Sequence, residues 1–87
     1  MKIVADKSNR DLRVVIYKKL LGYRVEIFDK NQSRIIYNLR CFNDSKQSNA
    51  ISCNAINSLE VGRVIYFKDD DYIIIQMLNS KEIIEIY

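Results

Sequence analysis

The chain has 87 residues, of which 48% are hydrophobic and 29% charged, with a formal net charge of +3 at pH 7. This length fits one domain over 1–87, and the hydrophobic fraction is too high for a disordered chain. The sequence contains no histidine, which excludes catalytic arrangements that need an imidazole as the base. With two cysteines and no histidine, a four-ligand zinc site is excluded as well. We therefore expect no enzyme and no cofactor.

The segments that would direct the chain to a membrane or out of the cell are not evident. The first residues lack the apolar stretch of a signal peptide. No apolar run approaches the roughly 20 residues that span a bilayer. Cys41 and Cys53 are twelve positions apart, and we read both as free, partly buried thiols in a reducing compartment. These features predict a cytoplasmic protein without a membrane partner.

The first half of the chain has the two-residue periodicity of half-buried strands. A short edge strand is expected at 3–5, and 12–20 is rich in valine, isoleucine and tyrosine. Apolar and polar residues then alternate over 23–27 and 34–41. Leu20–Gly22 fits a tight hairpin in which the glycine adopts a positive φ. A loop of two or three residues is compatible with this turn, so the faces of the adjoining strands stay open.

A different pattern between residues 43 and 62 predicts a helix. Ile51, Ala55 and Leu59 follow one another at intervals of four, which would place them on one apolar stripe. Gly62 stands where a glycine ends many helices. The interior holds several asparagines and serines, which are poor helix formers, so this helix would depend on packing against a sheet.

Three more strands are expected at 63–68, 72–78 and 82–87. Isoleucines at three successive positions make the middle strand apolar on both faces, which indicates a central strand or one that meets a second layer. A charged substitution at Ile74 is therefore expected to destabilise the protein. The predicted fold class is α+β, mostly antiparallel, with six or seven short strands and one central helix. A two-layer sandwich or a partly open barrel would accommodate them.

Charge is distributed unevenly along the chain. Residues 1–40 carry a formal charge of +6, and residues 41–87 carry −3. Cations and tyrosines interleave on the predicted strands, and together they would form a basic, aromatic sheet surface. Cations neutralise phosphates, and tyrosine and arginine dominate protein interfaces. The competing interpretation is that these cations are only the solvated faces and edges of strands. The candidate partner-binding residues are Arg13, Tyr17, Lys18, Lys19, Tyr23, Arg24, Arg34 and Arg40.

The second half carries an acidic run, Asp69, Asp70 and Asp71, at a predicted hairpin tip. Neither the spacing nor the glycine of a calcium-binding loop is present, so we expect no metal there. The run is instead a candidate acidic contact, for a basic patch on a partner or on a second copy. A chain with one basic and one acidic half would suit a homodimer or head-to-tail association.

No motif demands chemistry, and this favours a small non-catalytic binding protein that inhibits or modulates a macromolecular partner. A protein partner is favoured over nucleic acid because the net charge is only +3. The abundance of residues with AT-rich codons is common in short chains from low-GC bacteria and their phages. The small size and the lack of catalytic motifs are typical of phage- or mobile-element-type antagonists of host or defence machinery. The alternatives are a nucleic-acid-binding β-sheet module and a small histidine-free ribonuclease toxin that would position phosphate with arginine, lysine and tyrosine.

Overall fold

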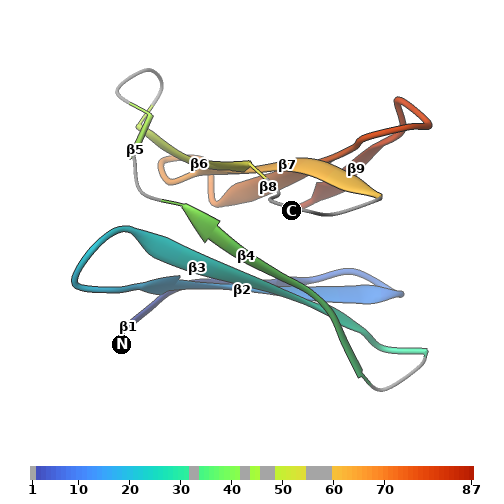
Figure 1. Ribbon diagram of the computed structural model, residues 1–87, viewed down its shortest axis with the longest axis horizontal. Helices are drawn as coiled ribbons and strands as arrows, with labels where there is room; N and C mark the ends of the chain where they lie inside the picture. The colour runs from blue at the N-terminus through green and yellow to red at the C-terminus, as the bar shows by residue number, and fades with distance from the viewer. Residues whose placement is uncertain (1, 32–33, 42–43, 46–48, 55–59) are drawn as a thin grey trace.

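The computed structural model describes residues 2–31, 34–41, 44–45, 49–54 and 60–87, with the backbone alone for 34–41 and 44–45. In this part of the chain, strands form two antiparallel sheets that face each other (Figure 1). The N-terminal sheet contains β1 (Lys2–Ser8), β2 (Leu12–Lys18), β3 (Tyr23–Asp29) and β4 (Arg34–Cys41). The C-terminal sheet contains β5 (Asp44–Ser45), β6 (Ala50–Asn54), β7 (Val61–Phe67), β8 (Tyr72–Met77) and β9 (Ile83–Ile86).

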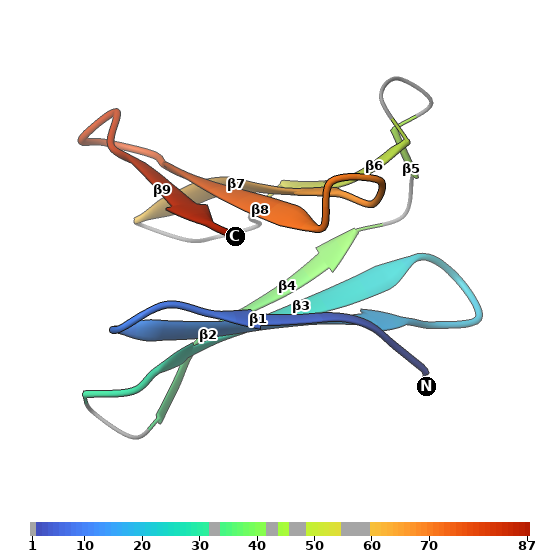
Figure 2. The same ribbon diagram turned by 180° about the vertical axis from the view of Figure 1, so that it is seen from behind.

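Each strand pairs with its neighbours in sequence, so both sheets are simple meanders. Seen from either side, one sheet lies over the other, and β4 crosses obliquely toward the C-terminal sheet (Figures 1 and 2). There β4 also contacts β6. The edges farthest from this crossing are β1 in one sheet and β9 in the other. The architecture is therefore a two-layer all-β arrangement.

The predicted α+β class is wrong, because the described residues contain no helix. Ile51 lies in β6 and Gly62 lies within β7, whereas Ala55 and Leu59 fall outside the described residues. The physical reason lies in the spacing itself: an interval of four residues is also two full periods of a strand. Ile51 and Cys53 are buried, whereas Ser52 between them and Asn54 after them are more exposed, which is the pattern of a strand. In the described part of the region in which one helix was expected, the chain forms β5, β6 and the start of β7.

The other predicted segments are strands in the structure, although they begin and end at slightly different residues. The apolar strand expected at 72–78 is β8, and it lies between β7 and β9 in the interior of its sheet. Ile73 and Ile75 point into the core, while Ile74 is half-buried on the outer face. The buried carboxylate that we expected from a charged residue at Ile74 would therefore arise at Ile73 instead.

The core lies between the inner faces of the two sheets and is built mostly from isoleucine and valine. These β-branched side chains fit a pleated, buried surface. In the N-terminal sheet the buried cluster contains Ala5, Val14, Ile16, Tyr23, Val25 and Ile27. In the C-terminal sheet it contains Ile51, Cys53, Val61, Val64, Tyr66, Ile73, Ile75 and Ile86. Cross-strand partners such as Val14 with Ile27, and Val64 with Ile75, lie on the same face, as antiparallel register requires.

The β2–β3 hairpin, whose register the sequence left open, has a four-residue loop. Lys18 pairs with Tyr23, and the N–H of Lys19 donates to the carbonyl of Gly22 at 3.0 Å. Gly22 has a φ of 81°, as predicted. This register places Arg13, Tyr17 and Arg24 on the outer face of the sheet, and Lys18 and Tyr23 on the inner face at its end.

The prediction of free thiols is also wrong. Cys53 is fully buried in the core and is disulfide-bonded. The sequence holds one other cysteine, Cys41, whose side chain lies outside the described part of the structure. Disulfides persist in oxidising compartments and are rare in the cytoplasm. The cytoplasmic location therefore loses the support that free thiols would have given it.

Truncating adjacent isoleucines of β8 tests the assignment of faces. Ile73→Ala should reduce the free energy of unfolding by about 2–5 kcal/mol, because it removes buried methyl groups and leaves a cavity. Ile74→Ala removes the same atoms from a half-buried position on the outer face and should cost about 1 kcal/mol or less. Urea denaturation of both variants measures the difference, and equal losses would contradict the assignment.

Alkylation under denaturing conditions tests the disulfide. Without reductant, iodoacetamide should add no mass to the protein, and after reduction it should label both cysteines. A native disulfide typically contributes about 2–4 kcal/mol to stability, so the reductant should also lower the urea midpoint. Two labels without reductant would contradict the disulfide and restore the argument for a cytoplasmic location.

Candidate partner-binding surface

Five of the eight predicted partner-binding residues lie at one end of the N-terminal sheet, around the β2–β3 loop. Tyr17 is the register partner of Arg24 on the outer face, and Lys18 is the partner of Tyr23 on the inner face. Lys19 begins the loop. Because β2 and β3 are antiparallel, the last residues of β2 and the first residues of β3 lie at the same end of the sheet. These five residues thus lie at one projecting end of the sheet, on its two faces and in the loop (Figure 1).

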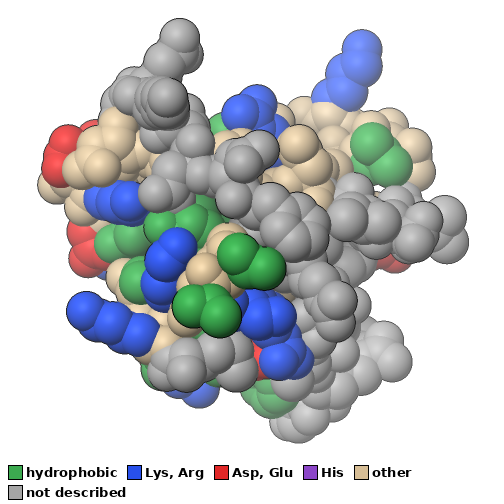
Figure 3. Space-filling model, turned by 60° about the vertical axis from the view of Figure 1, so that its left-hand side comes forward, with side chains coloured by type: hydrophobic (Ala, Val, Ile, Leu, Met, Phe, Trp, Pro, Cys, Tyr) green, Lys and Arg blue, Asp and Glu red, His purple; other side chains and the backbone are tan. Residues whose placement is uncertain are grey.

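The loop itself carries two leucines that the sequence analysis treated only as turn residues. The exposed fractions of Leu20 and Leu21 are 97% and 77%. Ile3 on β1 is the register partner of Tyr17 and is 52% exposed. We name the group formed by Ile3, Leu20, Leu21, Lys2, Lys18 and Lys19 the hairpin surface. Figure 3 shows the side of the molecule that carries the hairpin, where hydrophobic side chains lie among those of lysine and arginine.

The lysines of the hairpin surface are available for an external contact. Lys2 and Lys18 are register partners across β1 and β2, and both are exposed. The Lys18 ammonium lies 4.5 Å from the centroid of the Tyr23 ring, which holds it over an aromatic face without neutralising it. Among the described residues, no carboxylate forms an ion pair with Lys2, Lys18 or Lys19. The surface is therefore apolar at its tip and positively charged around it.

The arginines behave differently from the lysines, because two of them are paired within the chain. Arg13 donates from Nε and Nη2 to the two oxygens of Asp6, at 2.9 and 2.6 Å. This bidentate contact holds the pKa of the Asp6 carboxyl below its usual range. Arg24 Nη2 lies 3.0 Å from the carboxylate of Glu26. Arg13 also lies toward the far end of β2 from the loop, so it does not join the hairpin surface.

The two remaining predicted arginines lie on β4, where the backbone alone is described. Arg40 is the register partner of Arg24, and Arg34 is the partner of Asp29 at the other end of the strand. Their roles in partner binding stay predictions. The register nevertheless places one of them, Arg40, beside the hairpin end of the sheet and the other far from it.

The predicted acidic run forms the β7–β8 turn, and two of its members have contacts inside the protein. Asp69 accepts a hydrogen bond from the side-chain amide of Asn49 at 2.8 Å. Asp71 accepts from Lys7 of the other sheet at 2.7 Å and from the Tyr66 hydroxyl at 2.9 Å. Asp71 has a φ of 50°, a left-handed conformation that aspartate tolerates better than most residues. Two of these carboxylates therefore tie elements together.

Asp70 is exposed at the same turn, and the role of the whole run as an acidic contact stays a prediction. The Lys7–Asp71 pair spans the two sheets, from β1 to the turn after β7. The hydrogen bonds from Lys7 and then Tyr66 lower the pKa of the Asp71 carboxyl. Burial, followed by the hydrogen bond to Asp71, raises the pKa of Tyr66.

A second group of exposed apolar residues lies on the outer face of the C-terminal sheet. Leu78, Ile83 and Tyr87 are 55%, 57% and 79% exposed. The rings of Tyr72 and Tyr87 stack with centroids 4.7 Å apart, and Tyr72 stacks in turn on Phe67 at 5.8 Å. Leu78 and Ile83 lie beside the β8–β9 loop, whereas Tyr87 lies at the other end of β9, next to Tyr72. Neighbouring exposed apolar side chains such as Leu78 and Ile83, unlike single ones, indicate contact surfaces.

Carboxylates accompany this second group. Glu85 accepts hydrogen bonds from the hydroxyls of Tyr72 at 2.6 Å and Tyr87 at 3.3 Å. Glu60 and Glu82 are exposed beside the β8–β9 hairpin, and their carbonyls accept from the N–H groups of Leu78 and Met77. We name the group formed by Leu78, Ile83, Tyr87, Glu60, Glu82 and Glu85 the β8–β9 surface. This surface was not predicted from the sequence.

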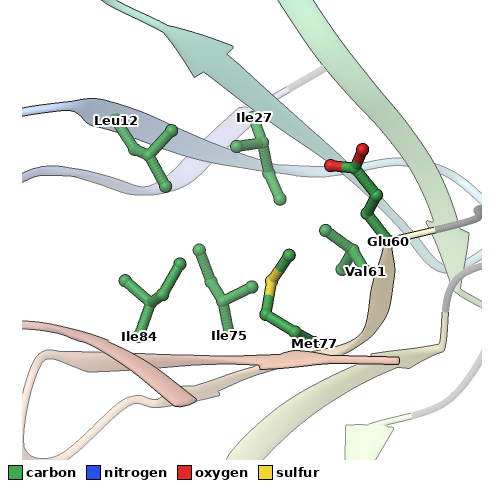
Figure 4. Close-up of a pocket in the computed structure, with 7 residues that line it drawn as sticks. All are labelled: Leu12, Ile27, Glu60, Val61, Ile75, Met77 and Ile84. Carbon is green, nitrogen blue, oxygen red and sulfur yellow. The ribbon is translucent and has the colours of Figure 1, made fainter. Parts of the chain in front are cut away.

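A small, largely apolar cavity of about 140 Å³ lies between the two sheets. In Figure 4, Leu12 and Ile27 point toward it from the N-terminal sheet, while Ile75 and Ile84 point from the C-terminal sheet. Val61 and Met77 complete the apolar lining, and Glu60 lies at one side. With this lining the cavity presents no set of polar groups that would orient a substrate.

No protein-family model, curated protein or solved structure matches this chain. Among the described residues there is also no helix long and apolar enough to cross a membrane. The candidate site therefore rests on its own geometry. Leu20 and Leu21 were the residues that sequence reasoning missed, and the available signal was a pair of leucines directly before the turn glycine.

The ion pair between the sheets predicts an acid-dependent loss of stability. Because folding lowers the pKa of Asp71 below its ordinary value of 3.8, the pair stabilises the protein above that pH and ceases to do so as the pH falls through the folded-state pKa. Asp71→Asn should therefore lower the urea midpoint at pH 7 and have little effect near pH 2. The exposed neighbour provides the control, since Asp70→Asn should change neither value. A pH-independent effect of Asp71→Asn would refute the electrostatic explanation.

Proposed function

We propose that this chain is a non-catalytic binding protein that attaches to a larger protein partner through the hairpin surface. The observation that carries the proposal is the exposure of Leu20 and Leu21, at 97% and 77%, within a collar of lysines. Two large apolar side chains at a projecting tip can enter a depression of a partner and be removed from water there. By covering such a depression, the protein would inhibit or modulate its partner.

A protein partner fits this surface better than nucleic acid does. Phosphate binding depends on several unpaired cations spread along a face. Here Arg13 and Arg24 are paired with carboxylates of the chain, and the tip between the lysines is apolar. The lysines suit a partner surface that carries carboxylates, which would speed association and orient the complex.

The ring of Tyr23 cannot serve as a stacking platform for a base. It is buried, and its face is occupied by the Lys18 ammonium. The half-buried Tyr17 on the outer face is the aromatic side chain of the predicted set that stays partly open. One such ring is less than a single-strand-binding sheet ordinarily presents. This supports the choice of a protein partner.

Site-specific photo-crosslinking in the native host tests the proposal. A photoreactive amino acid at position 20 should give a discrete crosslinked product with one protein, and Lys18→Glu with Lys19→Glu should reduce that product severalfold. The control position is Asn54, which is exposed and outside the hairpin surface, and it should not give the same product. Equal products from both positions would refute the proposed surface.

Mobility-shift and cleavage assays test the two alternatives directly. Purified protein should not shift single- or double-stranded DNA or RNA at 50 or 200 mM salt, and it should leave RNA intact on long incubation. A shift that weakens steeply with salt would instead establish the nucleic-acid-binding module. Cleavage that survives repurification would establish the ribonuclease.

A further inference from the structure

The large hydrophobic side chains that are exposed in the described part of the chain fall into two groups. Ile3, Leu20 and Leu21 belong to the hairpin surface, and Leu78, Ile83 and Tyr87 belong to the β8–β9 surface. The β2–β3 loop and the β8–β9 loop project at opposite ends of the molecule in both views (Figures 1 and 2). They also belong to different sheets. The protein therefore has two separate apolar contact areas.

The charges that surround the two areas are opposite in sign. The hairpin surface carries Lys2, Lys18 and Lys19 and no acidic residue. The β8–β9 surface carries Glu60, Glu82 and Glu85, with Lys81 as one nearby cation in the turn. Opposite charges around two apolar areas are the arrangement that steers surfaces together and selects their orientation. Like surfaces would instead repel each other, which disfavours a contact of hairpin surface with hairpin surface.

We propose that the occupant of the β8–β9 surface is the hairpin surface of a second copy of this chain. The leucines of one copy would pack against Leu78 and Ile83 of the next, and the lysines around them would face the nearby glutamates. This inference goes beyond the proposed function and does not depend on it, because both surfaces belong to the same chain. A partner bound at the hairpin surface and a second copy would compete for the same leucines.

The placement of the two surfaces determines the form of the assembly. A contact between two different surfaces of identical chains is heterologous, and it continues from copy to copy unless the rotation closes a ring. Since the β2–β3 loop and the β8–β9 loop project at opposite ends, contacts made through these loops favour an open row of chains over a closed pair. The hairpin tip is narrow, so the interface is small, and interfaces of this kind are weak and transient. Assembly should therefore depend on concentration and decrease with salt.

Analytical ultracentrifugation from micromolar to millimolar concentration tests the proposal. The weight-average mass of the full chain should rise past that of a dimer at low salt and fall back at 0.5 M NaCl. A mass that stays at the monomer overturns the proposal and leaves both surfaces to other partners. A mass that stops at the dimer also overturns it, because a symmetric pair would then be the assembly.

Two complementary variants identify the surfaces. Leu20→Asp with Leu21→Asp removes the tip, and Ile83→Lys disrupts the β8–β9 surface; each protein alone should be monomeric. When mixed, they should form a one-to-one complex that does not grow, because each supplies the surface that the other lacks. Ser8→Asp and Asn54→Lys, exposed and in neither surface, are the matched controls and should assemble like the wild type. Failure of the mixture to associate overturns the proposal.

A charge reversal keeps the test decisive if a variant does not fold. Lys19→Glu alone and Glu82→Lys alone should each weaken assembly severalfold, and the two changes in one chain should restore it at low salt. Because Ile83→Lys leaves the hairpin surface intact, it should still give the crosslink at position 20. If the crosslink to a partner is absent but the wild type assembles as described, only the proposed function is refuted. If the crosslink forms but the wild type does not assemble, only self-association is refuted.

Discussion

The packing of one apolar sheet face on another is the interaction on which this protein depends. Each strand sends alternate side chains inward, so valines and isoleucines of both sheets meet in a single buried layer. In the described residues no helix or second core supplements this layer. Every strand register is fixed by the need to keep that layer apolar, since a slip of one residue would bring lysines and glutamates into it.

That constraint leaves the loops and outer faces free to carry function. The β2–β3 hairpin can project two leucines into solvent because the strands beneath it are fixed by Val14, Ile16 and their partners on β3. The Lys7–Asp71 pair and the disulfide at Cys53 reinforce the same packing from its margins and its centre. A rigid sheet thus presents an apolar tip with little conformational freedom to lose, which favours binding.

The sequence predicted the strands well where polar and apolar residues alternate, as in 23–27, and it predicted the positive φ of Gly22. It failed between 43 and 62, because residues four apart share a face in a helix and in a strand alike. The surface could be predicted only in part. The cations near the hairpin were found from charge, but Leu20 and Leu21 were not, since leucine in a short turn has no periodicity to show whether it is buried.

The ion pairs of Arg13 and Arg24 show a further limit of the sequence. Asp6 and Glu26 reach these arginines only through the strand register and the side-chain geometry that folding imposes. A net charge counts all four groups without showing which of them are neutralised. This is why the basic face expected from composition contains, in the described part of the folded protein, two arginines that are paired with carboxylates of the same chain.

The cavity between Leu12, Ile27, Ile75 and Ile84 bears on how the protein responds to hydrostatic pressure. Apart from Glu60 at one side its lining is apolar, so most of the space offers water few hydrogen-bond partners and is poorly filled. Unfolding eliminates such space and thereby shrinks the system, and compression favours whichever state has the smaller volume. We therefore expect hydrostatic pressure to separate the two sheets first at the interface that holds this cavity.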